Sequence, residues 1–401
     1  MKSLLFIKNN KKVISYILIA LILIRFLYLN YINWKYGALT TGVPGVQYWL
    51  DSDRYLFGAD NLLNSLPVES RGGQYLGYIV FIAFFQLLGF SIEIIPIIQI
   101  CIALLAAYLL YNLTKSITGS RLSGIVSFGL YLLNPFITTW HLFILTESLY
   151  SSFVILACWS IYKVHLNPSI KNYILCSIIL IATIFIRPNG WIFIPIACCF
   201  FIFYSKKLIL KIRVSLISLT LLLFIIGAAS IPAFNKSIEA TTPYELMIKG
   251  EVIWDHPSER IKMPEDLSYK NSNWSNGFFY IIHHPISCIK LASLRIGKMF
   301  IQIREHHSFK YKAHILLWIL PAYLLALIGI FYCKKRSITF LITSIIIGHS
   351  IIVGLTYATH ESRFIIYILP IIYVLSGCGF SILFKNILRY LKMTENHMKI
   401  T

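Results

Sequence analysis

Acidic residues and arginines recur at the ends of apolar segments in this chain. The first apolar segment is followed by the stretch YWLDSDRY, which holds Asp51, Asp53 and Arg54. Residues of the same types occupy similar positions further on, namely Arg71, Glu147, Arg187, His360, Glu361 and Arg363. An ionised side chain at the centre of a membrane helix costs about 2.5–3.5 kcal/mol on insertion scales, so residues of this kind are candidates for function. A carboxylate can accept a proton, and a guanidinium group can bind an anion through two parallel hydrogen bonds. These residues could therefore catalyse proton transfer next to a bound anion.

Simpler roles remain open for several of these residues. Arg187 and Arg363 would anchor loops at lipid headgroups, and Glu147 would favour the dipole at the start of a helix. Asp53 would only solvate its loop. Asp51 is harder to dismiss, because it lies among the aromatic residues of YWLDSDRY.

The rest of the chain is strongly apolar. Of its 401 residues, 57% are hydrophobic and only 13% are charged, whereas a soluble domain carries roughly a quarter charged residues. Apolar runs of 18 or more residues recur, each long enough to cross about 30 Å of hydrocarbon. These features predict an all-α polytopic membrane protein. The net charge of +20 is explained by lysines and arginines that anchor the cytoplasmic side, so no nucleic-acid partner is expected.

Ten segments are expected to cross the bilayer: 13–32, 94–113, 122–141, 148–164, 173–186, 190–205, 212–233, 315–333, 338–357 and 364–384. The first is read as a retained helix, because no small-residue cleavage site follows it. The apolar segment 75–90 is expected to lie along the outer surface, because a crossing there would move every later basic cluster outside. Both termini are then cytoplasmic, and the candidate residues share the extracytoplasmic face.

The ordered motifs resemble those of the GT-C superfamily of glycosyltransferases. The stretches that carry the resemblance are DSDRY, RGGQYLGYIVFIAFFQLLGF, NPF followed by LTESLY, RPNGW and HESRFIIYILP. They are similar to motifs of the dolichyl-phosphate-mannose protein mannosyltransferases and of the bacterial aminoarabinose transferase of lipid A. The resemblance covers most of the chain and thins after about Ala240. It places Asp51, Arg54 and Tyr55 on the family's acid-then-Arg-Tyr motif, with Arg71 before two glycines where relatives have proline.

The resemblance implies a GT-C type helical bundle of about ten transmembrane helices with extracytoplasmic juxtamembrane helices. Residues 1–233 would be the transmembrane catalytic module, with the first extracytoplasmic loop at 33–93. Residues 234–314 would form a second extracytoplasmic loop with interfacial helices. Residues 315–401 would supply the last transmembrane helices and a cytoplasmic tail.

The implied activity is transfer of a hexose or pentose from a polyprenyl-phosphate donor to an extracytoplasmic glycan, lipid or protein. Asp51 would be the catalytic base and Glu147 the second catalytic acid, and attack opposite the phosphate would invert the anomeric centre. The residues expected to bind substrate are Asp53, Arg54, Tyr55, Arg71, Arg187, His360 and Arg363. Some members of the superfamily bind a divalent metal ion, which Asp51 and Glu147 would share, although the sequence shows no clear ligand set. The expected location is the plasma (inner) membrane, with multiple passes and the active site on the extracytoplasmic face.

Two other classes of function remain open. A lipid-linked-oligosaccharide polymerase or a flippase also uses arginine-rich outer loops, but has no need for an acid ahead of Arg-Tyr. A secondary transporter predicts internal repeats with broken spans at matching positions near the midplane. No such repeat is evident, and the acids lie at the membrane face.

Overall fold

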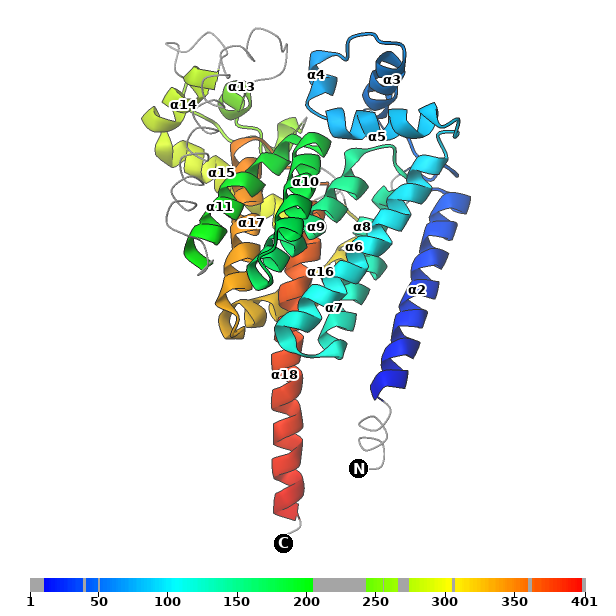
Figure 1. Ribbon diagram of the computed structural model, residues 1–401. Coiled ribbons are helices and arrows are strands. Elements are labelled where there is room, and N and C mark those ends of the chain that lie inside the picture. Colours follow the sequence, from blue (N-terminus) through cyan, green and yellow to red (C-terminus); the bar gives the residue numbers. More distant parts are fainter. Residues whose placement is uncertain are drawn as a thin grey trace.

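The computed structural model describes residues 11–38, 41–49, 51–204, 243–254, 256–265, 274–304, 307–359 and 363–398. Within these ranges the chain is helical, with isolated bridges between extended residues and no sheet. The long helices run side by side, and shorter helices cover one end of the bundle (Figure 1). The expected all-α polytopic membrane fold is confirmed.

Six of the described helices are long and apolar enough to cross a membrane. They are α2 (Lys11–Tyr36), α6 (Ile94–Thr118), α9 (Thr146–Leu166), α16 (Phe309–Tyr332), α17 (Arg336–Leu355) and α18 (Leu369–Met398). The apolar helices α10 (Ile170–Ile186) and α11 (Phe193–Tyr204) are shorter. Helices thus coincide with nine of the ten expected spans, and the remaining one, 212–233, lies outside the described residues.

The expected span 122–141 is bent. It consists of α7 (Arg121–Leu133), then α8 (Pro135–Thr138) and η1 (Thr139–Leu142), and its two parts meet at 51°. Pro135 has no N–H with which to continue α7. The side chain of Asn134 accepts a hydrogen bond from the backbone N of Phe136 at 2.8 Å, which caps the start of a new helix. The expected span therefore corresponds to a bent pair of helices, and the bend lies at the Asn-Pro pair.

The segment expected at the outer surface forms α5 (Leu76–Leu87), a helix of 12 residues. Its length is about 18 Å, too short to cross about 30 Å of hydrocarbon. Figure 1 shows α5 lying across the end of the bundle, beside α3 (Ser52–Leu63) and above the ends of α6 and α10. At Gly77 a Cβ atom would lie 2.7 Å from the backbone carbon of Phe185, so α5 crosses α10 at a point that only glycine permits.

Lysines near the ends of α6, α9 and α16 lie together at the other end of the bundle, which we call the basic end. Lys335 donates from Nζ to the carbonyl oxygen of Ser116 at 2.6 Å, which joins the loop after α16 to the end of α6. Lys115 and Lys163 line one cavity there. Helix α2 begins and α18 finishes at this end, away from α3 and α5 (Figure 1). On the expected topology, this end faces the cytoplasm.

A pair of reporter fusions tests this orientation. Alkaline phosphatase needs disulfides that form outside the cytoplasm. We expect activity when it is fused after Leu63, which follows the first span, and none when it is fused after Lys335, which lies at the basic end. A fluorescent protein that folds only in the cytoplasm should give the reverse pattern at the same two positions. Phosphatase activity at Lys335 would contradict the orientation.

The described part of the second loop consists of short helices that hold the chain just ahead of Arg363. These are α13 (Pro243–Ile248), η3 (Pro257–Glu259), α14 (Trp274–His283) and α15 (Pro285–Ile301). The backbone N of Trp254 donates to the carbonyl oxygen of Ala358 at 3.0 Å, and Arg295 donates to the carbonyl oxygen of Gly354 at 3.1 Å. The Arg295 side chain is fully buried, so it fastens backbone inside the fold and does not face headgroups.

Candidate active site

Asp51 lies at the start of α3 and points away from that helix. Ser52 Oγ accepts a hydrogen bond from the backbone N of Trp49 at 2.9 Å, which fixes the turn before α3. The Asp51 carboxylate makes no capping bond to α3. It pairs with Arg54 Nη1 at 3.2 Å and with Arg363 Nη2 at 2.7 Å. Its side chain remains 26% exposed, so one face of the carboxylate is accessible.

Glu147 is the second residue of α9 and is completely buried. Its Oε1 atom accepts hydrogen bonds from Arg187 Nη1 at 3.0 Å, from the Tyr367 hydroxyl at 3.0 Å and from Arg363 Nε. The Thr146 hydroxyl approaches its other oxygen at 3.4 Å. A buried carboxylate is stable only when it is paired and hydrogen-bonded, and Glu147 satisfies both conditions.

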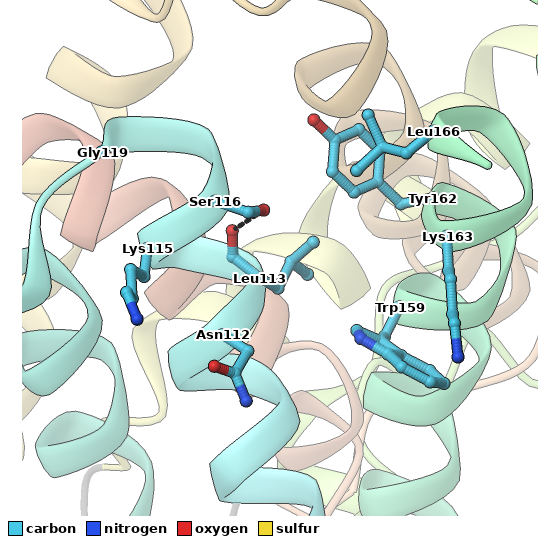
Figure 2. A pocket seen from close by; sticks show the side chains of 9 residues that line it. All are labelled: Asn112, Leu113, Lys115, Ser116, Gly119, Trp159, Tyr162, Lys163 and Leu166. Carbon is cyan, nitrogen blue, oxygen red and sulfur yellow. Dashed lines mark hydrogen bonds between the residues drawn. The ribbon is translucent and has the colours of Figure 1, made fainter.

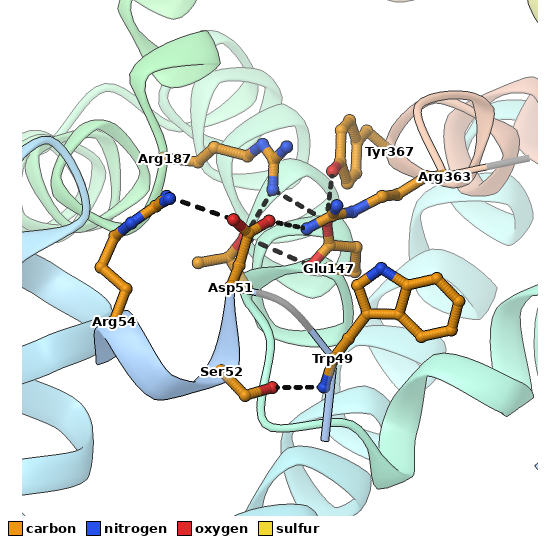
Figure 3. A network of polar contacts seen from close by, with 9 residues as sticks. Trp49, Asp51, Ser52, Arg54, Glu147, Arg187, Arg363 and Tyr367 are labelled. Carbon is orange, nitrogen blue, oxygen red and sulfur yellow. Dashed lines mark hydrogen bonds and ion pairs between the residues drawn. The ribbon is translucent and has the colours of Figure 1, made fainter. Parts of the chain in front are cut away.

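Arg363 joins the two acids. Its guanidinium contacts Asp51 through Nη2 and Glu147 through Nε, so it lies between the two carboxylates (Figure 3). Burial by itself lowers the pKa of Arg363, but Glu147, Tyr367 and Asp51 raise it well above its ordinary value. The group is therefore a permanent cation at this point.

Arg187, at the end of α10, also contacts Glu147. Pro188 disfavours a helical conformation at the residue before it, and Arg187 is extended, which turns its side chain toward α9. It is 6% exposed and donates to the Thr146 hydroxyl at 2.5 Å as well as to Glu147. Its guanidinium lies 4.8 Å from the ring centroid of Tyr367. Arg187 is thus an interior residue and not a headgroup anchor.

Asp51, Arg54, Glu147, Arg187 and Arg363 form one network, the acid–arginine cluster. Three guanidinium groups face two carboxylates, so the cluster carries one unbalanced positive charge. Its members come from the start of α3, the start of α9, the end of α10 and the turn before α18. A group of this charge attracts an anion such as a phosphate.

Residues 76–231 match the family model described as dolichyl-phosphate-mannose-protein mannosyltransferase. The matched stretch runs from α5 through α11 and contains Glu147 and Arg187. Among curated proteins, none matches the chain in sequence. This match, over less than half of the chain, supports a membrane glycosyltransferase of the GT-C type. Asp51 and Arg363 lie outside the matched stretch, and their place in the cluster comes from the ion pairs above.

The other residues expected to bind substrate are Asp53, Tyr55, Arg71 and His360. Tyr55 is 1% exposed and packs edge-to-face on Tyr75 and Tyr78, with ring centroids 5.3 and 5.1 Å away, so it holds α3 against α5. Asp53 is exposed on α3 and is not part of the cluster. Arg71 belongs to the short helix α4 (Ser70–Gly73), and its side chain lies outside the described part. His360 also lies outside the described residues.

Sequence reasoning missed the aromatic side chains behind the cluster. Tyr367, four residues after Arg363 in HESRFIIY, donates to Glu147. Its ring packs edge-to-face on Tyr150, with centroids 5.0 Å apart, and the Tyr150 hydroxyl lies 3.0 Å from His349 Nε2. The one available signal was the position of Tyr367 one helical turn beyond an arginine of a quoted motif. His349, in the middle of α17, gave none.

A metal ion shared by Asp51 and Glu147 does not fit this arrangement. Among the described residues, no three His, Cys, Asp or Glu side chains gather as a metal site. The space between the two carboxylates holds the Arg363 guanidinium, which donates to both of them. The cation that bridges the acids of the glycosyltransferase is thus an arginine.

Proposed function

We propose that this glycosyltransferase moves a sugar from a polyprenyl-phosphate donor to an acceptor hydroxyl on the extracytoplasmic face, with inversion at the anomeric carbon. The observation that carries the proposal is the partly exposed Asp51 carboxylate, held by Arg363 against buried Glu147 in a cluster with one unbalanced positive charge. Arg187 of the cluster follows the end of α10, which α5 crosses at Gly77, so the cluster lies near the end of the bundle that α5 covers. We place this end of the bundle at the outer leaflet, where the phosphate of a lipid-linked donor would lie.

Asp51 and Glu147 have different roles in this proposal. Glu147 is fully buried, and one of its oxygens already accepts three hydrogen bonds, so its role is to hold Arg187 and Arg363 in place. Asp51 is the acid that an acceptor can reach. An acceptor hydroxyl is a weak nucleophile, and a carboxylate that takes its proton during attack speeds the reaction. We therefore assign Asp51 as the base and Glu147 as a positioning residue.

The reaction is then a single nucleophilic displacement at the anomeric carbon. The acceptor oxygen forms a bond to the anomeric carbon while the bond from that carbon to the phosphate oxygen breaks. The acceptor proton passes to Asp51, and the electron pair leaves with the phosphate, giving polyprenyl phosphate. Arg187 and Arg363 face the charge that grows on this leaving group. Because the donor phosphate competes for Arg54 and Arg363, its binding frees an Asp51 oxygen for the acceptor.

Comparison of a deletion strain with its parent tests the proposal. Mass spectrometry of the envelope glycans should show the loss of one sugar, and lipid extracts should show a rise in the matching polyprenyl-phosphate sugar. Loss of a polymerase would instead leave complete but unpolymerised repeat units. Loss of a flippase or transporter would leave the donor on the cytoplasmic side. Unchanged glycans together with an unchanged donor pool would overturn the proposal.

Conservative changes at Arg187 and Arg363 should weaken donor binding. Arg187→Lys and Arg363→Lys keep the charge but lose the two-pronged geometry. Loss of one hydrogen bond to a charged group costs about 1.5–3 kcal/mol, so we expect the donor KM to rise by roughly 10- to 100-fold. The KM for the acceptor should change little.

Arg336→Lys, an exposed arginine at the opposite end of the molecule, is the matched control and should behave as wild type. Titrations of donor and acceptor with purified protein provide the measurement. Unchanged donor KM in both cluster variants would show that these arginines do not meet the phosphate.

A further inference from the structure

A second feature with the properties of a binding site lies at the basic end. A cavity of about 440 Å³ opens between the last turns of α6 and α9 (Figure 2). Ligand sites in proteins commonly occupy about 300–1,000 Å³. Glu147 is at the start of α9 and Lys163 is in its last turn, so this cavity and the acid–arginine cluster lie at opposite ends of one helix. The cavity is therefore separate from the proposed site of transfer.

The rim of the cavity is basic. Figure 2 shows Lys115 and Lys163 projecting from two different helices on either side of the opening. Lys335 lies beside them and donates to the carbonyl oxygen of Ser116, another lining residue. No acidic side chain is among the described residues that line the cavity, so the charge of the lysines is not balanced there.

The wall of the cavity is apolar and aromatic. It includes Trp159, Tyr162 and Leu166. The Lys163 ammonium lies 4.5 Å from the ring centroid of Trp159, which holds that lysine near the opening. Leu166 is 56% exposed at the end of α9. Aromatic residues and lysines at the end of membrane helices mark the depth of the lipid headgroups.

We propose that this cavity binds an anionic phospholipid of the cytoplasmic leaflet, with its phosphate at the rim that Lys115 and Lys163 make basic. The two lysines supply the positive charge, and the side of the cavity formed by Trp159 and Leu166 receives the upper part of an acyl chain. Basic pockets between transmembrane helices on the cytoplasmic side are suited to anionic headgroups. The bound lipid joins α6 to α9 and thereby stabilises the helix that carries Glu147.

Thermal unfolding of the full-length protein in detergent tests the proposal. A ligand that binds the folded state raises Tm in proportion to the logarithm of its concentration above Kd. Phosphatidylglycerol should raise Tm by several degrees, while phosphatidylcholine with the same acyl chains should raise it much less. Glycerol phosphate without acyl chains should have no effect, because the apolar wall would stay empty.

Variants identify the cavity as the place of binding. The double variant Lys115→Gln/Lys163→Gln should lose more than half of the shift caused by phosphatidylglycerol, and Lys115→Arg/Lys163→Arg should keep it. Lys334→Gln, an exposed lysine at the same end that does not line the cavity, is the matched control and should keep the full shift. An equal response to both lipids, or an unchanged shift in the double glutamine variant, would overturn the proposal.

Native mass spectrometry of the wild-type protein gives a readout that does not depend on the stability of any variant. With equal amounts of the two lipids present, phosphatidylglycerol should remain bound preferentially. Equal retention of both lipids would also overturn the proposal.

Discussion

Asp51→Asn is expected to lower the rate of sugar transfer by about two to four orders of magnitude, the usual contribution of a general base. Asparagine keeps the size of the side chain and can still accept a hydrogen bond from Arg363, but it cannot take a proton from the acceptor. The amount of protein in the membrane should change little, because Asp51 is partly exposed and lies at the edge of the cluster. The measurement is the initial rate per mole of purified protein at saturating donor.

Asp53→Asn is the matched control for this experiment. Asp53 is an acid of the same loop, two residues away, and its side chain is exposed on α3 outside the cluster. We expect its rate to stay close to that of the wild type. If Asp53 proved essential and Asp51 dispensable, the assignment of the base would be wrong by two residues.

Glu147→Gln is expected to have the largest effect on stability. Among the described residues, the change keeps the shape of the side chain but removes the carboxylate that pairs with Arg187, and it leaves Arg363 paired with Asp51. Breaking a buried ion pair by removing one partner costs about 3–5 kcal/mol, because the remaining charge stays buried without compensation. We expect a clearly lower Tm and a loss of transfer that follows from displaced arginines. Thermal unfolding and initial rates of the same preparations provide the measurement.

A double variant separates positioning from chemistry at Glu147. Glu147→Gln combined with Arg363→Met removes one of the uncompensated charges, so part of the lost stability should return. Transfer should not return, since the phosphate has lost one of its cations. If instead Glu147→Gln unfolded at the wild-type temperature and still lost as much activity as Asp51→Asn, Glu147 would be a reacting acid and not a positioning residue.

The sequence predicted the helices, and it predicted that several of the candidate residues lie near one another. Helices coincide with nine of the ten expected spans, and six of the described helices are long and apolar enough to cross a membrane. The distribution of lysines predicted that segment 75–90 does not cross, and it forms a helix of 12 residues. Placing Asp51, Glu147, Arg187 and Arg363 at one membrane face followed from the same count of basic loops. The ion pairs show that these four residues meet.

The pairings themselves could not be predicted from the sequence. Arg363 pairs with Asp51 and Glu147 because tertiary packing brings separate segments of the chain together. The contacts involved include the bend at Asn134, the close crossing of α5 and α10 at Gly77, and the hydrogen bonds from Arg295. Each of these contacts depends on tertiary packing and not on local pattern. Packing also decides the place of Tyr55. Its position in the loop motif suggested a substrate contact, but its ring is buried against α5.

The most direct test of transfer from a lipid phosphate within the acid–arginine cluster is phosphorus NMR of the reaction. Purified protein in nanodiscs is incubated with a polyprenyl-phosphate sugar and an envelope extract as acceptor. The phosphodiester signal of the donor should convert into the phosphomonoester signal of polyprenyl phosphate with wild-type protein and with Asp53→Asn, but not with Asp51→Asn. A phosphodiester signal that persists with the wild type, or that disappears equally fast with Asp51→Asn, would contradict the proposed chemistry.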